Sequence, residues 1–130
     1  LIDRLHKQNP AVQFLLTGLA SSDFLLKSLK GRSYVHGMLG KADVLTAAAM
    51  MKHFNVYLTG DTGPLHVASA MDVPLLSLFG GATSPEVTGP HPKADHRRVL
   101  QADNMSDISV EAVLRSLGQL CPALFPQKAS

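Results

Sequence analysis

Short apolar runs alternate with longer amphipathic runs along most of this 130-residue chain, and this alternation restricts the possible folds more than any other feature. The short runs are typical of buried strands, while the longer runs place apolar residues at helical spacing. Strands and helices in regular alternation are typical of β-α units around a parallel sheet. We therefore predict an α/β fold with a parallel sheet and flanking helices, whose strands span residues 12–16, 34–38, 55–58, 73–79 and 98–101.

Residues typical of helix ends indicate where the helices begin. Ser21 or Ser22 can cap the first helix, Asp43 the next, and Ser109 the last, because their side-chain oxygens accept hydrogen bonds from free backbone N–H groups. A short helix over residues 64–71 begins with proline, which is favoured at that position. These signals agree with the strands in predicting β-α units.

The length and composition fit one globular domain. With 45% hydrophobic and 17% charged residues, the chain can bury a core without disulfides. No linker or repeat interrupts it, so residues 1–130 are predicted to form a single domain with its core at about 11–120. Residues 80–85 have the composition of a loop, and the tail from Cys121 is expected to be surface chain.

Charge and targeting signals exclude several classes of function. The formal net charge is only +2 and the basic residues are scattered, which argues against a nucleic-acid partner. The single cysteine suggests a reducing compartment, and the chain has neither an apolar stretch of about 18 residues nor a signal peptide. We expect a cytoplasmic protein. Because the chain begins at Leu1, we also expect it to be a piece of something longer or processed.

The segment from Thr59 to His66 is the best candidate for a binding site. It follows a predicted strand and precedes a predicted helix, so it lies where ligands bind in parallel α/β sheets, near free N–H groups. Gly60 and Gly63 would let the backbone bend and approach an anion closely, and Thr62 offers a hydroxyl donor or a helix cap. The turn is thus suited to a phosphate group.

Other interpretations of this segment stay open at this point. A Gly-Asp-Thr-Gly sequence is also found in plain β-α connections. Asp61 could be a catalytic base, a ligand for sugar hydroxyls, or a residue that fixes the turn. His66 could donate to a phosphate oxygen or have no ligand at all.

The sequence lacks several familiar functional motifs, and their absence reduces the number of possible functions. The sequence has no G-x-G-x-x-G, no P-loop and no G-x-S-x-G. Its six histidines do not show the close pairing of a helical zinc motif, so we expect neither a metal nor a cofactor.

Three ordered motifs carry a resemblance to a known family. Asp61-Thr62-Gly63-Pro64-Leu65-His66 comes first, then Ala68-Ser69-Ala70 through Pro74 to Leu78-Phe79-Gly80, and then Ser84-Pro85-Glu86-Val87-Thr88-Gly89-Pro90. In order and spacing they closely resemble the C-terminal domain of the family 9 glycosyltransferases, the bacterial heptosyltransferases of lipopolysaccharide core synthesis. Weaker similarity extends the resemblance over roughly residues 11–120.

The resemblance implies a Rossmann-like domain, the C-terminal half of a two-domain GT-B enzyme that holds the nucleotide-sugar donor. Asp61, Thr62, Gly63, Pro64, Leu65 and His66 would surround the diphosphate and sugar of an ADP-heptose-like donor. Gly40, Lys41 and Ala42 would approach the adenine, and Asp23 would stand where the family has a ribose-binding Glu. The full enzyme would be an inverting transferase with a lipopolysaccharide-type acceptor, and could touch the inner membrane peripherally through that acceptor.

Two departures from the family pattern limit what is implied. Asp23 is one methylene shorter than the family's Glu, which puts its ribose contact in doubt. The family's catalytic base and a phosphate-binding Lys precede the segment that begins here at Leu1. We therefore expect the isolated chain to lack an N-terminal domain and to be inactive in transfer. The alternative is a non-catalytic nucleotide or nucleotide-sugar binding module.

Overall fold

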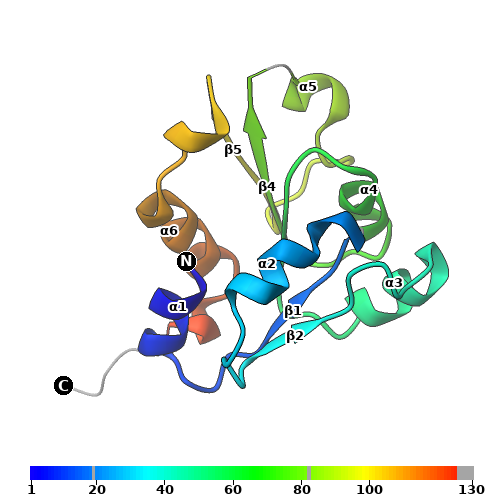
Figure 1. Cartoon of the computed structure of the whole chain (residues 1–130). Coiled ribbons are helices and arrows are strands. Elements are labelled where there is room, and N and C mark those ends of the chain that lie inside the picture. Colours follow the sequence, from blue (N-terminus) through cyan, green and yellow to red (C-terminus); the bar gives the residue numbers. More distant parts are fainter. Residues whose placement is uncertain (19, 82, 126–130) are drawn as a thin grey trace. The chain divides into compact units, whose positions relative to one another are not determined.

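The computed structural model describes residues 1–18, 20–81 and 83–125 (Figure 1). The chain divides into two compact units. The first unit is Leu1–Ala47 and the second begins at Ala48. Strands pair only in parallel in both units, and helices connect them. The predicted α/β class with parallel strands is therefore confirmed. No helix in these residues is long and apolar enough to cross a membrane.

The first unit contains a two-stranded parallel sheet. Strands β1 and β2 pair with Phe14 opposite Val35 and Leu16 opposite Gly37. The two strands and the helices around them can be followed in Figure 1. The elements of this unit are α1 (Ile2–Gln8), β1 (Phe14–Leu16), η1 (Ala20–Ser22), α2 (Asp23–Ser28) and β2 (Val35–Gly37), and α3 (Val44–Met51) leads into the second unit.

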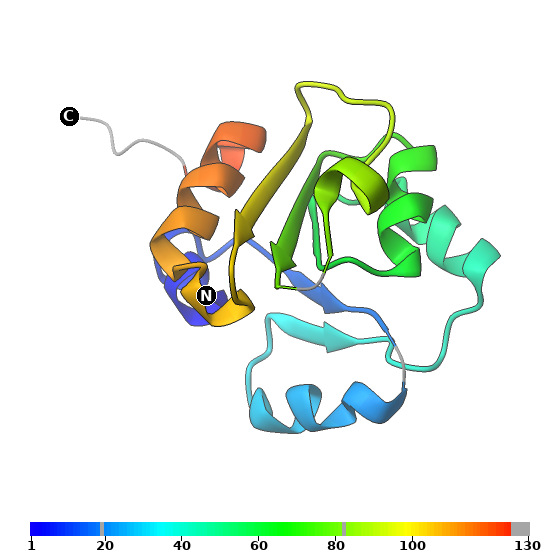
Figure 2. The ribbon, with the colours of Figure 1, turned by 90° about the horizontal axis from the view of Figure 1, so that it is seen from above.

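The second unit contains a three-stranded parallel sheet in the order β3-β4-β5. Figure 2 shows β4 beside β5, and their register places Leu75 opposite Arg97. As the central strand, β4 is apolar along almost its whole length, which is typical of a strand covered on both faces. The elements are β3 (Tyr57–Thr59), α4 (Gly63–Ala70), β4 (Leu75–Gly80), α5 (Pro85–Thr88), β5 (Arg97–Ala102), η2 (Met105–Asp107), α6 (Val110–Leu120) and η3 (Pro122–Leu124).

One hydrophobic cluster holds α4 against the sheet of the second unit. Leu65 and Ala68 on α4 are completely buried with Leu75 and Phe79 on β4. Removing a side chain such as that of Phe79 from a core typically costs about 3–5 kcal/mol. Because one face of α4 is fixed in this way, its first turn is presented at a defined place after β3. The rest of the cluster is Met51 and Val73, with Phe54, Tyr57, Val67 and Met71 packed around it.

Two of the predicted helix caps are confirmed and one is wrong. The Asp43 carboxylate accepts from the Thr46 N–H at 2.7 Å, and this bond lowers the pKa of Asp43. The Ser109 hydroxyl accepts from the Ala112 N–H at 3.1 Å. Ser22 occupies the N-cap position of α2 but its side chain makes no capping bond, because the 3₁₀ turn η1 leads directly into the helix.

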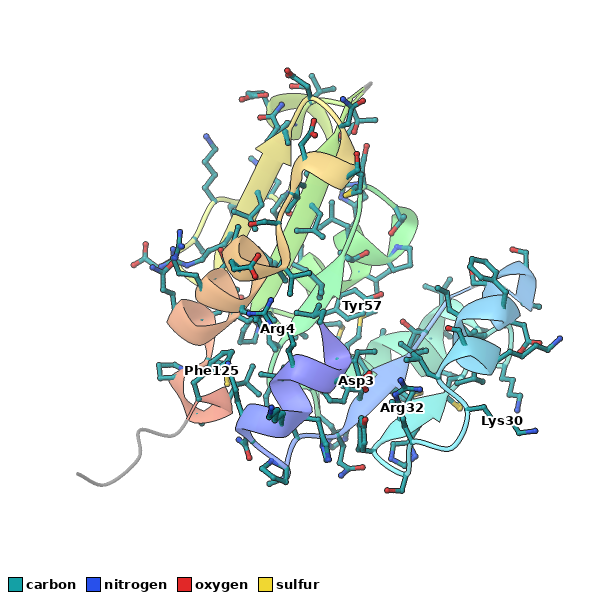
Figure 3. The ribbon with its side chains drawn as sticks, turned by 60° about the vertical axis from the view of Figure 1, so that its left-hand side comes forward. Asp3, Arg4, Lys30, Arg32, Tyr57 and Phe125 are labelled. Atoms are coloured by element: carbon teal, nitrogen blue, oxygen red, sulfur yellow. The ribbon has the colours of Figure 1, made fainter. Side chains whose placement is uncertain are left out.

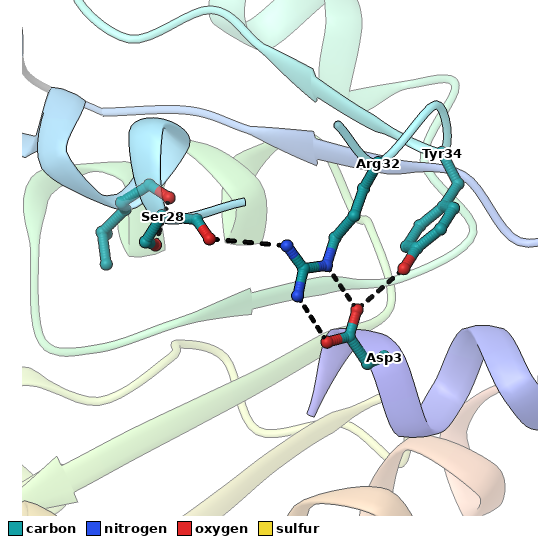
Figure 4. Close-up of polar contacts among 5 residues, drawn as sticks. Asp3, Ser28, Arg32 and Tyr34 are labelled. Carbon is teal, nitrogen blue, oxygen red and sulfur yellow. Dashed lines mark hydrogen bonds and ion pairs between the residues drawn. The ribbon is translucent and has the colours of Figure 1, made fainter. Parts of the chain in front are cut away.

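A polar cluster joins α1 to the segment before β2. Figure 3 shows Asp3 and Arg32 pointing toward one another, and Figure 4 shows the bonds among them. Arg32 donates to both carboxylate oxygens of Asp3, at 2.6 and 2.8 Å, and the Tyr34 hydroxyl donates to the same carboxylate at 2.7 Å. These donors hold the pKa of Asp3 well below its usual range, Arg32 contributing most. The cluster is exposed, so water screens much of its strength.

Some elements differ from the sequence-based expectations. Helix α1 was not predicted, and α5 begins at Pro85, the last residue of the predicted loop 80–85. The tail was expected to lie on the surface, but Leu124 is buried and η3 continues directly from α6, so that part of the prediction is wrong. The remainder of the tail, residues 126–130, lies outside the described residues.

Candidate functional site

The turn between β3 and α4 leaves the sheet at its carboxyl edge. Strand β3 ends at Thr59, which is paired with Ser77 of β4, and α4 begins at Gly63. Leu65 faces the core and is completely buried, whereas His66 is exposed. The buried side chain of Leu65 therefore fixes the start of α4 against the core, while the other residues of its first turn stay accessible to a ligand.

Backbone N–H groups at the start of α4 are free to bind a ligand. Neither the N–H of Thr62 nor that of Gly63 donates a hydrogen bond to any described residue, and Pro64 has no N–H. The first N–H groups of a helix have no partner inside it, and they attract anions together with the helix dipole. This geometry is suited to an anionic group with several oxygen atoms.

The Thr62 hydroxyl does not cap the helix. Thr62 occupies the N-cap position of α4, but its Oγ1 lies 3.2 Å from Oγ1 of Thr59 and makes no bond to the helix. The capping alternative for this side chain is therefore wrong. Because the hydroxyl does not occupy the free N–H groups, they remain available.

Gly60 and Gly63 are not required by the conformation of the turn. Neither has a φ in the left-handed region that favours glycine. A Cβ atom added at Gly63 would meet nothing within 4 Å, and one added at Gly60 would meet only the Leu78 carbonyl oxygen at 3.8 Å. The expectation that these glycines serve a sharp bend is therefore wrong. The chain itself leaves open space beside Gly63.

Asp61 is connected to α5, the short helix that follows β4. The Thr88 hydroxyl donates to Oδ2 of Asp61 at 3.0 Å and also lies 3.1 Å from the Ser84 carbonyl oxygen. Asp61 is half-buried. Two of the three motifs singled out in the sequence thus meet at this edge, and the bond between them could not be predicted from either motif alone.

In the first unit, the turn after β2 lies against the turn after β1. Gly40 donates through its N–H to the Gly18 carbonyl at 2.7 Å and has φ +69°. A Cβ at Gly40 would lie 2.8 Å from Cβ of Ala20, the first residue of η1. Glycine is therefore needed here by both backbone conformation and space. Lys41 is exposed and Ala42 is half-buried.

Asp23 lies in the same unit, at the start of α2 and directly after η1. Its carboxylate is 3.2 Å from Nζ of Lys27, one helical turn away, and both side chains are largely exposed. Such pairs stabilise a helix by about 0.3–0.5 kcal/mol. The predicted residues thus form two groups, one in each unit: Asp23 with Gly40, Lys41 and Ala42, and the segment from Asp61 to His66.

A second polar network lies at the opposite end of α4. Arg97 is almost completely buried and donates to the Ser69 carbonyl at 2.9 Å and to the Asp72 carboxylate at 2.9 Å. His96 Nε2 lies 2.7 Å from the same carboxylate. A cation that bonds the last carbonyls of a helix stabilises its C-terminus. We assign this network to the stability of the second unit. Among the described residues, no group of His, Cys, Asp and Glu is placed to hold a metal ion.

A parallel strand that ends in an accessible turn, with free N–H groups at the start of the next helix, is typical of α/β domains that bind ligands at the carboxyl ends of their strands. Within this class, the chain belongs to glycosyltransferase family 9, the heptosyltransferases, whose family model matches residues 1–116. The resemblance stated from the motifs is confirmed. Among curated proteins, no sequence matches the chain significantly.

Solved structures show the same fold. The chain is similar to ADP-heptose lipopolysaccharide heptosyltransferase II from E. coli, with a TM-score of 0.77 and 25% sequence identity. It is also similar to the family 9 glycosyl transferase from Veillonella parvula, with a TM-score of 0.78 and 20% identity, and to E. coli heptosyltransferase WaaC with ADP, with 0.78 and 21%. Each comparison covers 92% of this chain but only 40%, 40% and 37% of the respective solved chain.

Proposed function

We propose that this chain binds the nucleotide-diphosphate sugar donor of a glycosyltransferase, an ADP-heptose-like molecule. The observation that carries the proposal is the start of α4, where the N–H groups of Thr62 and Gly63 have no partner among the described residues and open space lies beside Gly63. Since neither conformation nor packing requires glycine at this position, the close approach of a ligand explains it best. The family supports a diphosphate as that ligand.

The chemistry of sugar transfer gives these N–H groups a role. As the bond to the sugar breaks, negative charge develops on the leaving diphosphate, and fixed donors aimed at it stabilise the transition state. His66, exposed one helical turn into α4, adds a further possible donor. Asp61, which lies within the turn, is the proposed acceptor for sugar hydroxyls.

A separate part of the proposal concerns residues of the first unit, taken by itself. We propose that Gly40, Lys41 and Ala42 contact the adenine, while Asp23 serves the ribose. The ion pair between Asp23 and Lys27 would have to open or rearrange for that contact, because a carboxylate held by Lys27 has fewer free lone pairs. Because this ion pair is exposed, its rearrangement costs little free energy.

The remaining parts of the proposal concern the whole protein. Because the chain spans about 40% of the length of the family 9 glycosyltransferases it matches, transfer itself is a proposal. We propose an inverting transferase in the cytoplasm that acts on a lipopolysaccharide-type acceptor, with the catalytic base on an N-terminal domain.

Calorimetric titration of the chain with ADP, UDP and ADP-heptose tests the donor site. We expect micromolar to millimolar dissociation constants and a preference for the adenine nucleotides. The substitution Gly63→Val should lower ADP affinity at least tenfold, because a branched side chain would fill the space proposed for the phosphate. Thermal stability should stay close to that of the original chain, since a Cβ at this position meets nothing within 4 Å.

A matched control is Ala70→Val, which adds a branched side chain at the exposed last residue of the same helix. It should leave ADP affinity unchanged. If the original chain binds none of the three nucleotides, the proposed function is wrong. If it binds ADP but Gly63→Val binds equally well, the diphosphate has been placed at the wrong turn. Donor binding by a chain that never transfers, even with its N-terminal domain and acceptor supplied, would favour the binding-module alternative.

A further inference from the structure

The Thr88 hydroxyl lies between two acceptors and has only one hydrogen to donate. Its Oγ1 is 3.0 Å from Oδ2 of Asp61 and 3.1 Å from the carbonyl oxygen of Ser84. We propose that Thr88 is a positioning residue, which orients the Asp61 carboxylate toward the sugar of the donor. This inference rests on the proposed function, because it assigns the sugar-facing side of that site.

The Ser84 carbonyl does not need the hydroxyl proton. It already accepts the backbone N–H of Val87 at 3.0 Å and that of Thr88 at 2.9 Å, and a carbonyl oxygen has two lone pairs. The Asp61 carboxylate is the stronger acceptor, because hydrogen bonds to an ionised group are roughly twice as strong as those between neutral groups. The hydroxyl therefore donates to Asp61.

Helix α5 holds Thr88 in one place. Pro85 begins the helix, and the N–H of Gly89 donates to the Pro85 carbonyl at 2.9 Å, which closes the single turn. Gly89 passes so close to Pro85 that a Cβ would lie 2.2 Å from the Pro85 oxygen. At the start of the turn, the Ser84 hydroxyl bonds the Glu86 carboxylate and lowers the pKa of Glu86. The motif from Ser84 to Pro90 thus folds into a single turn that holds the Thr88 side chain in place.

Asp61 retains an oxygen for a ligand. Oδ2 accepts from Thr88, whereas Oδ1 accepts no hydrogen bond from any described residue, and the side chain is only half-buried. A carboxylate with one oxygen fixed has lost most of its rotational freedom, so the other oxygen points in a defined direction. A hydroxyl-bearing group bound after the diphosphate is the natural donor to it. Thr88 should therefore affect recognition of the sugar and not of the nucleotide.

The experiment compares two substitutions at one position with two ligands. Thr88→Val replaces the hydroxyl by a methyl group of similar size, Thr88→Ser keeps the hydroxyl, and each is titrated with ADP and with ADP-heptose. The control Thr83→Val makes the same exchange at an exposed threonine in the preceding loop, which makes no hydrogen bond to the described residues.

We expect Thr88→Val to weaken ADP-heptose binding about tenfold, the order of magnitude for a hydrogen bond to a charged group. ADP affinity should change less than about twofold, since ADP has no sugar beyond its phosphates. Thr88→Ser should restore most of the ADP-heptose affinity, and Thr83→Val should bind both ligands like the original chain.

Three other results would each overturn the positioning role proposed for Thr88. An equal loss for ADP and ADP-heptose would mean that Thr88 supports the whole turn, and no loss for either would mean that Asp61 does not need it. A Thr88→Ser variant as weak as Thr88→Val would assign the effect to the methyl group. In all three cases ADP binding by the original chain upholds the proposed function, which fails separately if the original chain binds no nucleotide.

Discussion

Glycines on the two sides of the candidate site are present for different reasons. Gly63, at the start of α4, has an ordinary φ and open space where a Cβ would be. Gly89, at the end of α5, also has an ordinary φ, but a Cβ there would lie 2.2 Å from the Pro85 oxygen. Both belong to motifs shared with the same family, yet only Gly89 is required by the chain itself.

This difference separates residues that build the site from residues that make room for a ligand. A glycine that contacts its own backbone is needed whether or not a ligand is bound. A glycine beside empty space and free N–H groups is needed only if something else comes close. Substitution of a glycine of the first kind should therefore lower stability, whether or not binding also falls. Substitution of a glycine of the second kind should lower binding and leave the folded chain as stable as before, and a loss of stability there would contradict this distinction.

The largest effect on stability is expected for Gly80→Ala, at the end of the central strand β4. A Cβ there would lie 2.4 Å from the Met105 nitrogen and 2.8 Å from its Cα, and backbone atoms cannot move aside as a flexible side chain can. We expect a loss of about 3 kcal/mol in the free energy of unfolding, typical of severe overpacking. Urea denaturation followed by circular dichroism measures it. A variant as stable as the original chain would contradict the assigned contact.

A smaller loss of stability is expected for Gly89→Ala, together with a change in binding. The added Cβ would push the end of α5 away from Pro85 and carry Thr88 away from Asp61. Because α5 is a single turn at the edge of the unit, we expect a loss of about 1–2 kcal/mol in unfolding free energy. ADP-heptose affinity should fall as in Thr88→Val, with ADP affinity almost unchanged. Equal loss of both ligands would indicate that α5 also supports the diphosphate turn.

Local signals in the sequence predicted much of this fold, and contacts between distant residues account for what was missed. Asp43 and Ser109 were found as caps because a cap depends only on the residues that follow it. Helix α1 has mostly polar residues and is held by Asp3 bonding Arg32, 29 positions later. A local pattern cannot predict such a bond.

The same reasoning applies to the candidate site. The turn before α4 was found from its glycine and proline chemistry, but α5 is only four residues long and too short to show any helical period. The bond from Thr88 to Asp61 spans 27 positions. Moreover, a glycine in a sequence does not reveal whether its φ, its neighbours or a ligand requires it. The sharp bend expected at Gly63 was therefore wrong, whereas the close approach of an anion there stays a prediction.

The smallest effect on stability, and the sharpest test of the comparison, is expected for Gly63→Ala. Alanine can adopt the backbone conformation there, so the substitution should leave the folded chain intact and raise its unfolding free energy by about 0.4–1 kcal/mol through the lower entropy of the unfolded chain. ADP affinity should fall several-fold, because even a methyl group would intrude between the phosphate and the free N–H groups. Stability and binding would then change in opposite directions at one residue. Parallel loss of both would mean that Gly63, like Gly89, serves the chain, and the proposed place of the diphosphate would lose its main support.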